Sequence, residues 1–293
     1  MTGFVQSKIE LERDVQNELL NWKNKRHHTV LQIEGPWHVG KTHEVKKFVY
    51  SHYKQVVYVN LVRDEYGFED LMLTDHFMRE YCRNAGIGEY VDDESTVLVI
   101  DEIQERANVY NAIRDLREQL GCDIIVSGSY LARTVNSRDF FLPAGIAYLQ
   151  MYPLSFKEFC RALNIEDILE TISLRSESKD EDYQKLEEAY QVYRKIGGYP
   201  LVVTTFIESR QIDDCMVVLE DLIRTFTAES SRFFTNSTAL SIFQEAYKAV
   251  LVQIAEEKKG TGKTFLEFVT NFVKDTVKEP VSRNEVRTAA SWL

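Results

Sequence analysis

The first half of the chain alternates short apolar runs with longer stretches of helical periodicity. The runs are rich in β-branched and aromatic residues and apolar almost throughout, which is typical of strands buried on both faces of a sheet. They cover residues 29–33, 56–62, 96–100, 123–126 and 146–151. Helical patterns lie between them at residues 43–53, 68–83 and 109–120. This alternation predicts an α/β domain with a parallel sheet and helices on both sides.

Beyond residue 153 the strand pattern stops, and helical periodicity continues along the rest of the sequence. Ser155 and Glu158 have the spacing of a capping box, in which the hydroxyl and the carboxylate bind main-chain N–H groups of the first turn. Ser282 and Glu285 repeat this spacing. Further helices are predicted at residues 156–163, 182–196, 201–208, 214–227, 240–257 and 265–276. We predict three parts, which are a core over residues 1–153, a helical region over 154–235 and a second helical region over 236–293.

Composition limits the classes of protein to be considered. The 293 residues include 46 acidic and 35 basic side chains, a formal net charge of −11, which argues against a broad nucleic-acid-binding surface. The four cysteines lie far apart without a C-x-x-C pair, so neither a disulfide framework nor a zinc site is indicated. The first residues lack the apolar stretch of a signal peptide, and no apolar run reaches the roughly 18 residues of a membrane span. We expect a cytoplasmic protein without membrane contact.

A glycine-rich motif directly follows the first predicted strand. It consists of Gly35, Pro36, Trp37, His38, Val39, Gly40, Lys41 and Thr42. These residues fit the phosphate-binding pattern Gly-x-x-x-x-Gly-Lys-Ser/Thr. In such a loop the main-chain N–H groups face phosphate oxygens, and the helix that follows presents its positive end to the same anion. We expect Lys41 to reach the β- and γ-phosphates of ATP and the Thr42 hydroxyl to bind Mg²⁺.

The apolar run at residues 97–100 ends in two carboxylates, Asp101 and Glu102. In enzymes with this kind of loop, the first acid holds Mg²⁺ through water, and a neighbouring glutamate can polarise the water that attacks the γ-phosphorus. Adjacent carboxylates leave a strand end in different directions, so they can divide these two tasks. The same two acids could simply lie at a strand end exposed to solvent. The position of the pair downstream of the glycine-rich loop favours the catalytic interpretation.

The next predicted strand ends in Ser127, Gly128 and Ser129. A hydroxyl at this place could contact the γ-phosphate and report which nucleotide is bound, although serine and glycine also suit an ordinary turn. We slightly favour Ser129 over Ser127 as this residue. The predicted catalytic residues are Lys41, Glu102 and Ser129, and the predicted metal-binding residues are Thr42 and Asp101.

Five motifs follow one another within residues 10–210. They are the loop at 35–42, Leu-Val-Ile-Asp-Glu-Ile-Gln at 98–104, Ser-Gly-Ser at 127–129, Pro-Leu-Ser-Phe-Lys-Glu-Phe at 153–159 and Gly-Gly-Tyr-Pro at 197–200. In this order they resemble prokaryotic AAA+ ATPases of the archaeal-ATPase-like and STAND-related branch. The resemblance implies a sheet of five parallel strands followed by an α-helical lid. In this sheet the strand with the sensing hydroxyl would lie between the strand before the glycine-rich loop and the strand that ends in Asp101. It also implies that Tyr199 and Pro200 lie in the lid near the adenine.

The chain departs from this family at several positions. Members usually carry a basic or amide pair where Trp37 and His38 stand. Many members also have an arginine finger, for which Arg133 and Arg138 are the candidates here. Residues 258–264 resemble a second phosphate-binding loop, but Glu257 replaces the first glycine and no strand precedes it, so we expect an ordinary loop.

The tail, residues 280–292, is predicted to form a capped amphipathic helix. With the helices predicted at 240–257 and 265–276 it resembles the front half of a winged helix. Arg283 and Arg287 would then lie on the exposed side of the recognition helix, where they could contact DNA phosphate. A helix that only braces the lid fits the same pattern. A wing hairpin should begin where the sequence stops, so we expect the chain to be a piece of a longer protein.

These features favour an ATP-binding, Mg²⁺-dependent AAA+-type ATPase that acts as a nucleotide-driven conformational switch. ATP that bridges core and lid would favour a closed state, and hydrolysis to ADP would release it. One alternative is a non-hydrolysing module in which nucleotide joins lid to core while the helical tail recruits protein or DNA. Another is a small-molecule kinase with a phosphate-acceptor pocket. The sequence gives neither the protein client nor the oligomeric state.

Overall fold

The computed structural model describes residues 9–25, 30–129, 145–173, 177–231, 237–256, 265–277 and 279–292. The chain divides into two compact units, Met1–Val218 and Leu219–Leu293. The division falls inside helix α12 (Ile212–Ser230). The further division of the first unit near residue 153 into core and lid stays a prediction, as does the boundary near residue 235.

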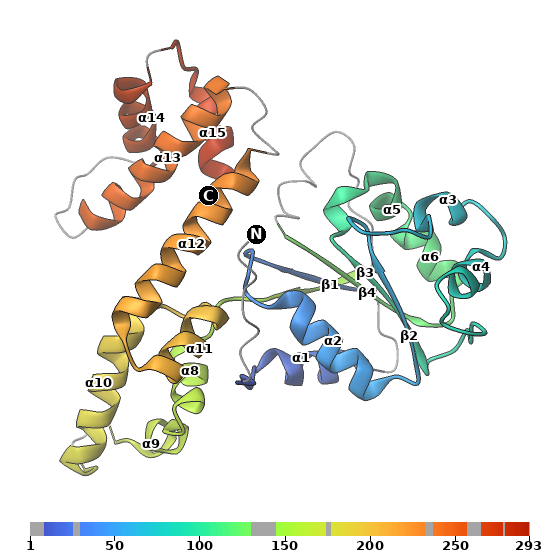
Figure 1. Ribbon diagram of the computed structural model, residues 1–293, viewed down its shortest axis with the longest axis horizontal. Coiled ribbons are helices and arrows are strands. Elements are labelled where there is room, and N and C mark those ends of the chain that lie inside the picture. The colour runs from blue at the N-terminus through green and yellow to red at the C-terminus, as the bar shows by residue number, and fades with distance from the viewer. Residues whose placement is uncertain are drawn as a thin grey trace. The chain divides into compact units, whose positions relative to one another are not determined.

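A five-stranded parallel sheet forms the centre of the first unit (Figure 1). Its strands are β1 (Val30–Gly35), β2 (Gln55–Asn60), β3 (Thr96–Asp101), β4 (Asp123–Ser129) and β5 (Ile146–Gln150). Their order is β2-β3-β4-β1-β5. Strand β4 therefore lies between β1 and β3, as the family resemblance implied. Every residue of β3 and β4 is buried, which explains the continuous apolar runs at residues 97–100 and 124–126.

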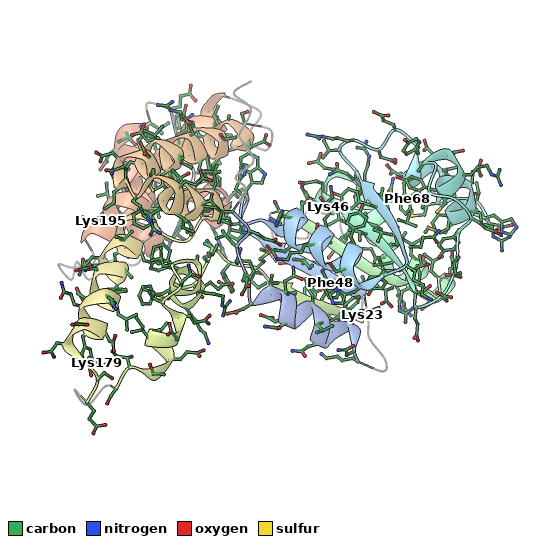
Figure 2. The ribbon with its side chains drawn as sticks, turned by 60° about the horizontal axis from the view of Figure 1, so that its bottom comes forward. Lys23, Lys46, Phe48, Phe68, Lys179 and Lys195 are labelled. Atoms are coloured by element: carbon green, nitrogen blue, oxygen red, sulfur yellow. The ribbon has the colours of Figure 1, made fainter. Side chains whose placement is uncertain are left out.

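Helices cover both faces of this sheet. On one face α1 (Val15–Lys23) and α2 (Lys41–His52) pack against Val97 and Val99 of β3. Leu98 and Ile100 point to the other face, because side chains alternate along a strand. That face is covered by α3 (Phe68–Leu71), α4 (Phe77–Asn84), α5 (Ala107–Asn111) and α6 (Ile113–Gln119). Phe48 of α2 and Phe68 of α3 (Figure 2) belong to these two separate clusters, so the predicted α/β architecture is confirmed.

The helix predicted over residues 68–83 is two helices with a break at residues 72–76. In the break the Thr74 hydroxyl donates a hydrogen bond to the Leu71 carbonyl at 2.8 Å. Such side-chain bonds compete with the main-chain pattern of a helix. Apolar periodicity alone does not reveal this competition, because Phe77 and Tyr81 keep the same buried face after the break.

The helical part of the first unit consists of α8 (Phe156–Ala162), α9 (Glu166–Thr171), α10 (Asp180–Ile196) and α11 (Pro200–Ser209). Helix α9 was not expected from the sequence. The predicted capping box at α8 is confirmed, because Glu158 N donates to Ser155 Oγ at 3.2 Å and Ser155 N donates to Glu158 Oε2 at 2.8 Å. Helix α8 packs against both α9 and α10.

The second unit contains α13 (Ser237–Glu256), α14 (Phe265–Thr276) and α15 (Arg283–Trp292), which pack against one another. Phe243, Val269 and Val286 are fully buried among them. Ser282 and Glu285 form the predicted capping box at the start of α15. The winged-helix assignment stays a prediction. Among the helices that the structure describes, none is long and apolar enough to cross a membrane.

The turn before α11 lies directly against the segment before α8. Leu154 N donates to the Gly198 carbonyl at 2.6 Å, and a Cβ atom on Gly198 would lie 2.0 Å from the Leu154 carbonyl oxygen. We expect Gly198→Ala to lower the free energy of unfolding by about 3 kcal/mol, because the main chain must move apart. Gly86→Ala is the control, since Gly86 has a positive φ but faces open space, and should cost about 1 kcal/mol. Equal losses in urea unfolding would contradict this expectation.

Candidate functional site

The glycine-rich loop joins the end of β1 to the start of α2, at the carboxyl edge of the sheet. Gly40 has φ +93°, a left-handed conformation that favours glycine, and Val39 beside it is fully buried. Among the described residues, no hydrogen bond uses the main-chain N–H groups of Gly40, Lys41 or Thr42. Free N–H groups at the start of a 12-residue helix form a place where an anion binds.

Lys41 lies within this loop with only 8% of its surface exposed. Its Nζ donates hydrogen bonds to the carbonyl oxygens of Gly35 at 2.9 Å and Pro36 at 2.8 Å. Burial lowers the pKa of Lys41 to about 8, although the charges of Glu102 and Asp101 act in the opposite direction. The ammonium group therefore lies at the start of the same loop, and two neutral carbonyls are its hydrogen-bond acceptors.

Thr42 and Asp101 meet between the loop and the end of β3. Thr42 Oγ1 donates to Asp101 Oδ2 at 2.9 Å, and the Tyr58 hydroxyl donates to the same oxygen at 2.5 Å. Asp101 is 3% exposed. Mg²⁺ usually binds one or two carboxylates, water and substrate phosphates. A threonine hydroxyl in contact with a buried aspartate next to an anion-binding loop fits this donor set.

Glu102 follows the end of β3 in a left-handed conformation, φ +57°, which is uncommon outside glycine and is typical of functional sites. Burial raises the pKa of its carboxyl group, and the charge of Asp101 adds to this effect. Gln104 Nε2 donates to Glu102 Oε2 at 2.5 Å. Gln104 Oε1 is buried without a hydrogen-bond partner in the described part of the chain. A buried free acceptor beside Glu102 suits a water molecule.

The two serines of β4 reach this site at different places. Ser129 pairs in register with Gly35 of β1, and Ser127 pairs in register with Asp101 of β3. Both are buried. The Ser127 hydroxyl donates to Asp101 Oδ1, so this serine holds the aspartate. Ser129 lies beside the first glycine of the loop, and its assignment as the sensing residue stays a prediction.

The start of α11 also lies at the loop. A Cβ atom on Gly40 would be 3.8 Å from Pro200 Cγ, and Tyr199 packs against the apolar cluster that contains Val39. The Trp37 and His38 rings contact each other at 3.9 Å between centroids. The structure thus brings the predicted nucleotide-binding residues together. Arg133, Arg138 and residues 257–264 lie outside the described residues.

Tyr58 and Gln104 were not assigned a role from the sequence, and Ser127 was considered only as the less favoured sensing residue. Tyr58 and Ser127 bind Asp101, and Gln104 binds Glu102. The sequence offered one indication of the role of Tyr58. A tyrosine in an otherwise apolar, buried strand usually has a hydrogen-bond partner for its hydroxyl. The identity of that partner depends on the pairing of β2 with β3.

Comparisons with known proteins agree with this geometry. Residues 27–160 match a family model described as AAA domain. An uncharacterized protein of Haemophilus influenzae is 29% identical over 110 residues, which cover 38% of this chain and 24% of the relative, so the match spans about a quarter of that protein.

The fold is also similar to that of the Walker-type ATPase paby2304 of Pyrococcus abyssi. The TM-score is 0.50 at 13% identity, and the alignment covers 96% of each chain. This likeness concerns the fold alone. Together with the family match and the motif order, it supports a nucleotide-binding domain of the ATPase type. The match of residues 27–160 to the AAA domain family, with this fold, supports an AAA+/STAND-related P-loop ATPase family.

Proposed function

We propose that the chain is an Mg²⁺-dependent ATPase that hydrolyses ATP to ADP and phosphate and acts as a nucleotide-driven conformational switch. The observation that carries this proposal is the meeting of Lys41, Thr42, Asp101 and Glu102 at one edge of the sheet. Tyr199 and Pro200 add a lid segment at the same loop. Nucleotide bound there would contact both parts and so favour their closed arrangement.

The residues of the site have separate tasks in this proposal. The Lys41 ammonium leaves the two loop carbonyls and binds the β- and γ-phosphates. Thr42 and Asp101 would hold Mg²⁺, which would supply positive charge to neutralise the phosphates. The Glu102 carboxylate accepts a proton from water as the water oxygen attacks the γ-phosphorus. The bond from this phosphorus to the β–γ bridging oxygen breaks, and Ser129 donates to the γ-phosphate. Because Glu102 has a raised pKa, it is a stronger base than an exposed glutamate.

The direct test uses the purified chain. ATP binding is measured by calorimetry, and phosphate release is measured with and without Mg²⁺. Turnover that requires Mg²⁺ supports the proposal, and binding without any turnover favours the non-hydrolysing module. A chain that binds no ATP would contradict both.

The affinity for ATP should fall as the pH rises above about 8. Lys41 has a pKa of about 8 in the free protein, and a bound polyphosphate raises that pKa, so binding takes up a proton above pH 8. We expect about a tenfold loss of affinity between pH 7 and 9. The phosphate groups of ATP are already ionised over this range, so they do not add to the pH dependence. Lys41→Arg should remove most of this dependence because its guanidinium stays protonated. Equal affinities of the parent protein at pH 7 and 9 would contradict the assignment.

A second candidate is transfer of the γ-phosphoryl group to a small anionic acceptor. It is favoured by a hollow of about 270 Å³ beside Tyr58, which is lined by Lys46 (Figure 2), Arg63 and other polar residues. Neither cation forms an ion pair within the described ranges. Tyr58 also binds Asp101, so the hollow adjoins the proposed metal site. If product analysis finds the γ-phosphate on a metabolite instead of free in solution, the chain is a kinase and not an ATPase.

The partners of the chain are a separate part of the proposal. Arg283 and Arg287 are exposed on α15, which suits either DNA phosphate or a protein client. Stimulation of turnover by DNA that disappears with added salt would support the DNA interpretation. Turnover that is indifferent to DNA would favour a protein client.

A further inference from the structure

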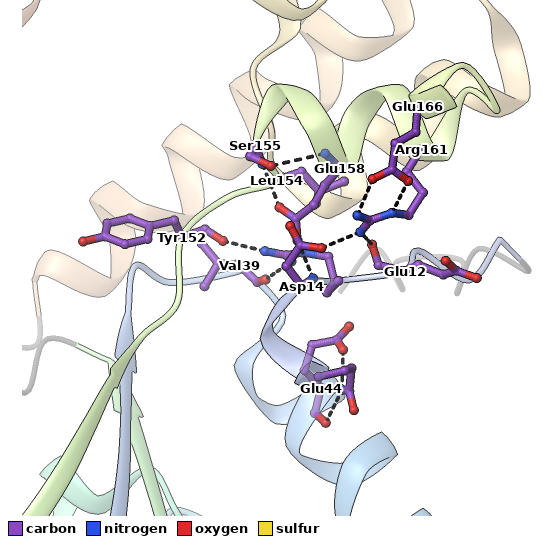
Figure 3. Close-up of polar contacts among 12 residues, drawn as sticks. Glu12, Asp14, Val39, Glu44, Tyr152, Leu154, Ser155, Glu158, Arg161 and Glu166 are labelled. Carbon is purple, nitrogen blue, oxygen red and sulfur yellow. Dashed lines mark hydrogen bonds and ion pairs between the residues drawn. The ribbon is translucent and has the colours of Figure 1, made fainter. Parts of the chain in front are cut away.

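Arg13 precedes α1 and is almost completely buried, with 4% of its side chain exposed. Its three guanidinium nitrogens each have a different partner, and Figure 3 labels these partners, which are Glu158, Val39 and Tyr152. Nε donates to Glu158 Oε1 at 3.0 Å, Nη1 to the Val39 carbonyl at 3.1 Å and Nη2 to the Tyr152 carbonyl at 2.7 Å. One side chain thus joins the glycine-rich loop, the segment after β5 and helix α8.

Both carboxylate oxygens of Glu158 also accept hydrogen bonds. Its Oε1 also accepts a hydrogen bond from Asp14 N at 2.9 Å, and its Oε2 accepts one from Ser155 N at 2.8 Å. Burial opposes ionisation, but these main-chain bonds and the charge of Arg13 lower the pKa of Glu158. Each guanidinium nitrogen and each carboxylate oxygen of the pair therefore has a hydrogen-bond partner, which helps to offset the cost of burying the two charges.

The contact with Val39 bears on the geometry of the phosphate-binding loop. The Val39 carbonyl and the Gly40 N–H belong to one planar trans peptide group, so they point in opposite directions. Arg13 holds the carbonyl on the side of α8. The Gly40 N–H, which has no partner among the described residues, is thereby turned to the other side of the loop. The next N–H groups, of Lys41 and Thr42, also have no hydrogen-bond partner in the part of the chain that the structure describes.

We infer that Arg13 is a positioning residue for nucleotide binding, which turns the Gly40 N–H toward the bound phosphate. Because the same guanidinium binds Glu158, the shape of the loop depends on the docking of α8, the first helix after the sheet. The inference rests on the proposed function, since it concerns affinity for nucleotide. It links the first helix of the proposed lid to the phosphate-binding loop through Arg13.

Arg13→Lys tests the inference because lysine keeps the charge but cannot reach three separated acceptors from one nitrogen. Arg161→Lys is the matched control. Arg161 also joins α8 to the segment before α1, through Asp14 at 2.7 Å, and binds Glu166 at 2.6 Å, but none of its hydrogen bonds reaches the loop. If α8 docking alone matters, the two variants should behave alike.

The sequence contains a single Val-Gly pair, Val39-Gly40. Labelling with carbonyl-¹³C valine and ¹⁵N glycine therefore selects the NMR signal of this one peptide group in the protein without nucleotide. We expect Arg13→Lys to shift that signal and to weaken ADP binding about tenfold. Arg161→Lys should leave the signal in place and change ADP affinity less than twofold.

An unshifted signal in Arg13→Lys, or an equal shift in Arg161→Lys, would overturn the inference. If Arg13→Lys does not fold, the double variant Arg13→Met, Glu158→Gln removes both buried charges and takes its place. A parent protein that fails to bind ADP would instead contradict the proposed function, and the NMR signal would still show whether Arg13 orients the peptide group.

Discussion

Lys41→Ala is expected to weaken ATP binding about 100-fold. The reason is the loss of charge-assisted hydrogen bonds to phosphate, worth about 3 kcal/mol, and tenfold in affinity corresponds to about 1.4 kcal/mol. The unliganded protein should stay folded, because removal of a buried ammonium group also removes its cost of burial. Calorimetric titration with ATP measures the affinity, and thermal unfolding measures the stability.

Lys47→Ala is the control for this change. Lys47 lies on the same helix but forms an ion pair with Glu10, both members being partly exposed. Its removal should leave the affinity for ATP within twofold of the parent value, since exposed pairs contribute little. Similar losses in both variants would mean that general charge, and not the loop lysine, accounts for binding.

Glu102→Gln is expected to lower the rate of ATP hydrolysis at least 100-fold while ATP binding stays within twofold. The amide keeps the size of the side chain but cannot accept a proton, and a positioned general base contributes a factor of about 100 to 10,000. Because the pKa of Glu102 is raised, turnover of the parent protein should fall as the pH falls through that pKa. Phosphate release at saturating ATP measures both effects.

Glu105→Gln is the matched control, since Glu105 lies in the short helix Ile103–Glu105 after Glu102 but has no proposed part in the reaction. It should hydrolyse ATP within twofold of the parent rate. If Glu102→Gln also turned over ATP at the parent rate, the assignment of the base would be wrong. The non-hydrolysing module predicts that neither parent nor variants release phosphate.

The strands were predictable because their burial is visible in the sequence. Residues 96–101 and 123–129 are buried on both faces, and each segment contains a continuous apolar run, at 97–100 and 124–126. Helix ends were also predictable where a side chain caps them, as at Ser155 and Ser282. The break at Thr74 was not predicted, because one hydroxyl-to-carbonyl bond decides it without changing the apolar pattern.

Within the site, the motif spacing predicted the loop, the two acids and the serine strand. It did not predict that Ser127 and Tyr58 bind Asp101, because these contacts depend on which strands are neighbours and in what register. Glu158, the ion-pair partner of Arg13, lies 145 residues away from it in the chain. An arginine before the first helix is usually exposed, and only the packing of α8 shows that this one is buried.

The sequence by itself determined the local features of this protein: the strands, most helices, their caps and a loop built to bind phosphate. These features arise from periodicity and from bonds between residues close in the chain, which a sequence displays directly. The tertiary structure alone decided the strand register, the hydrogen-bond partners of Asp101 and the contact between Arg13 and Val39. Each of these joins segments far apart in the chain, and their proximity depends on how the whole core packs.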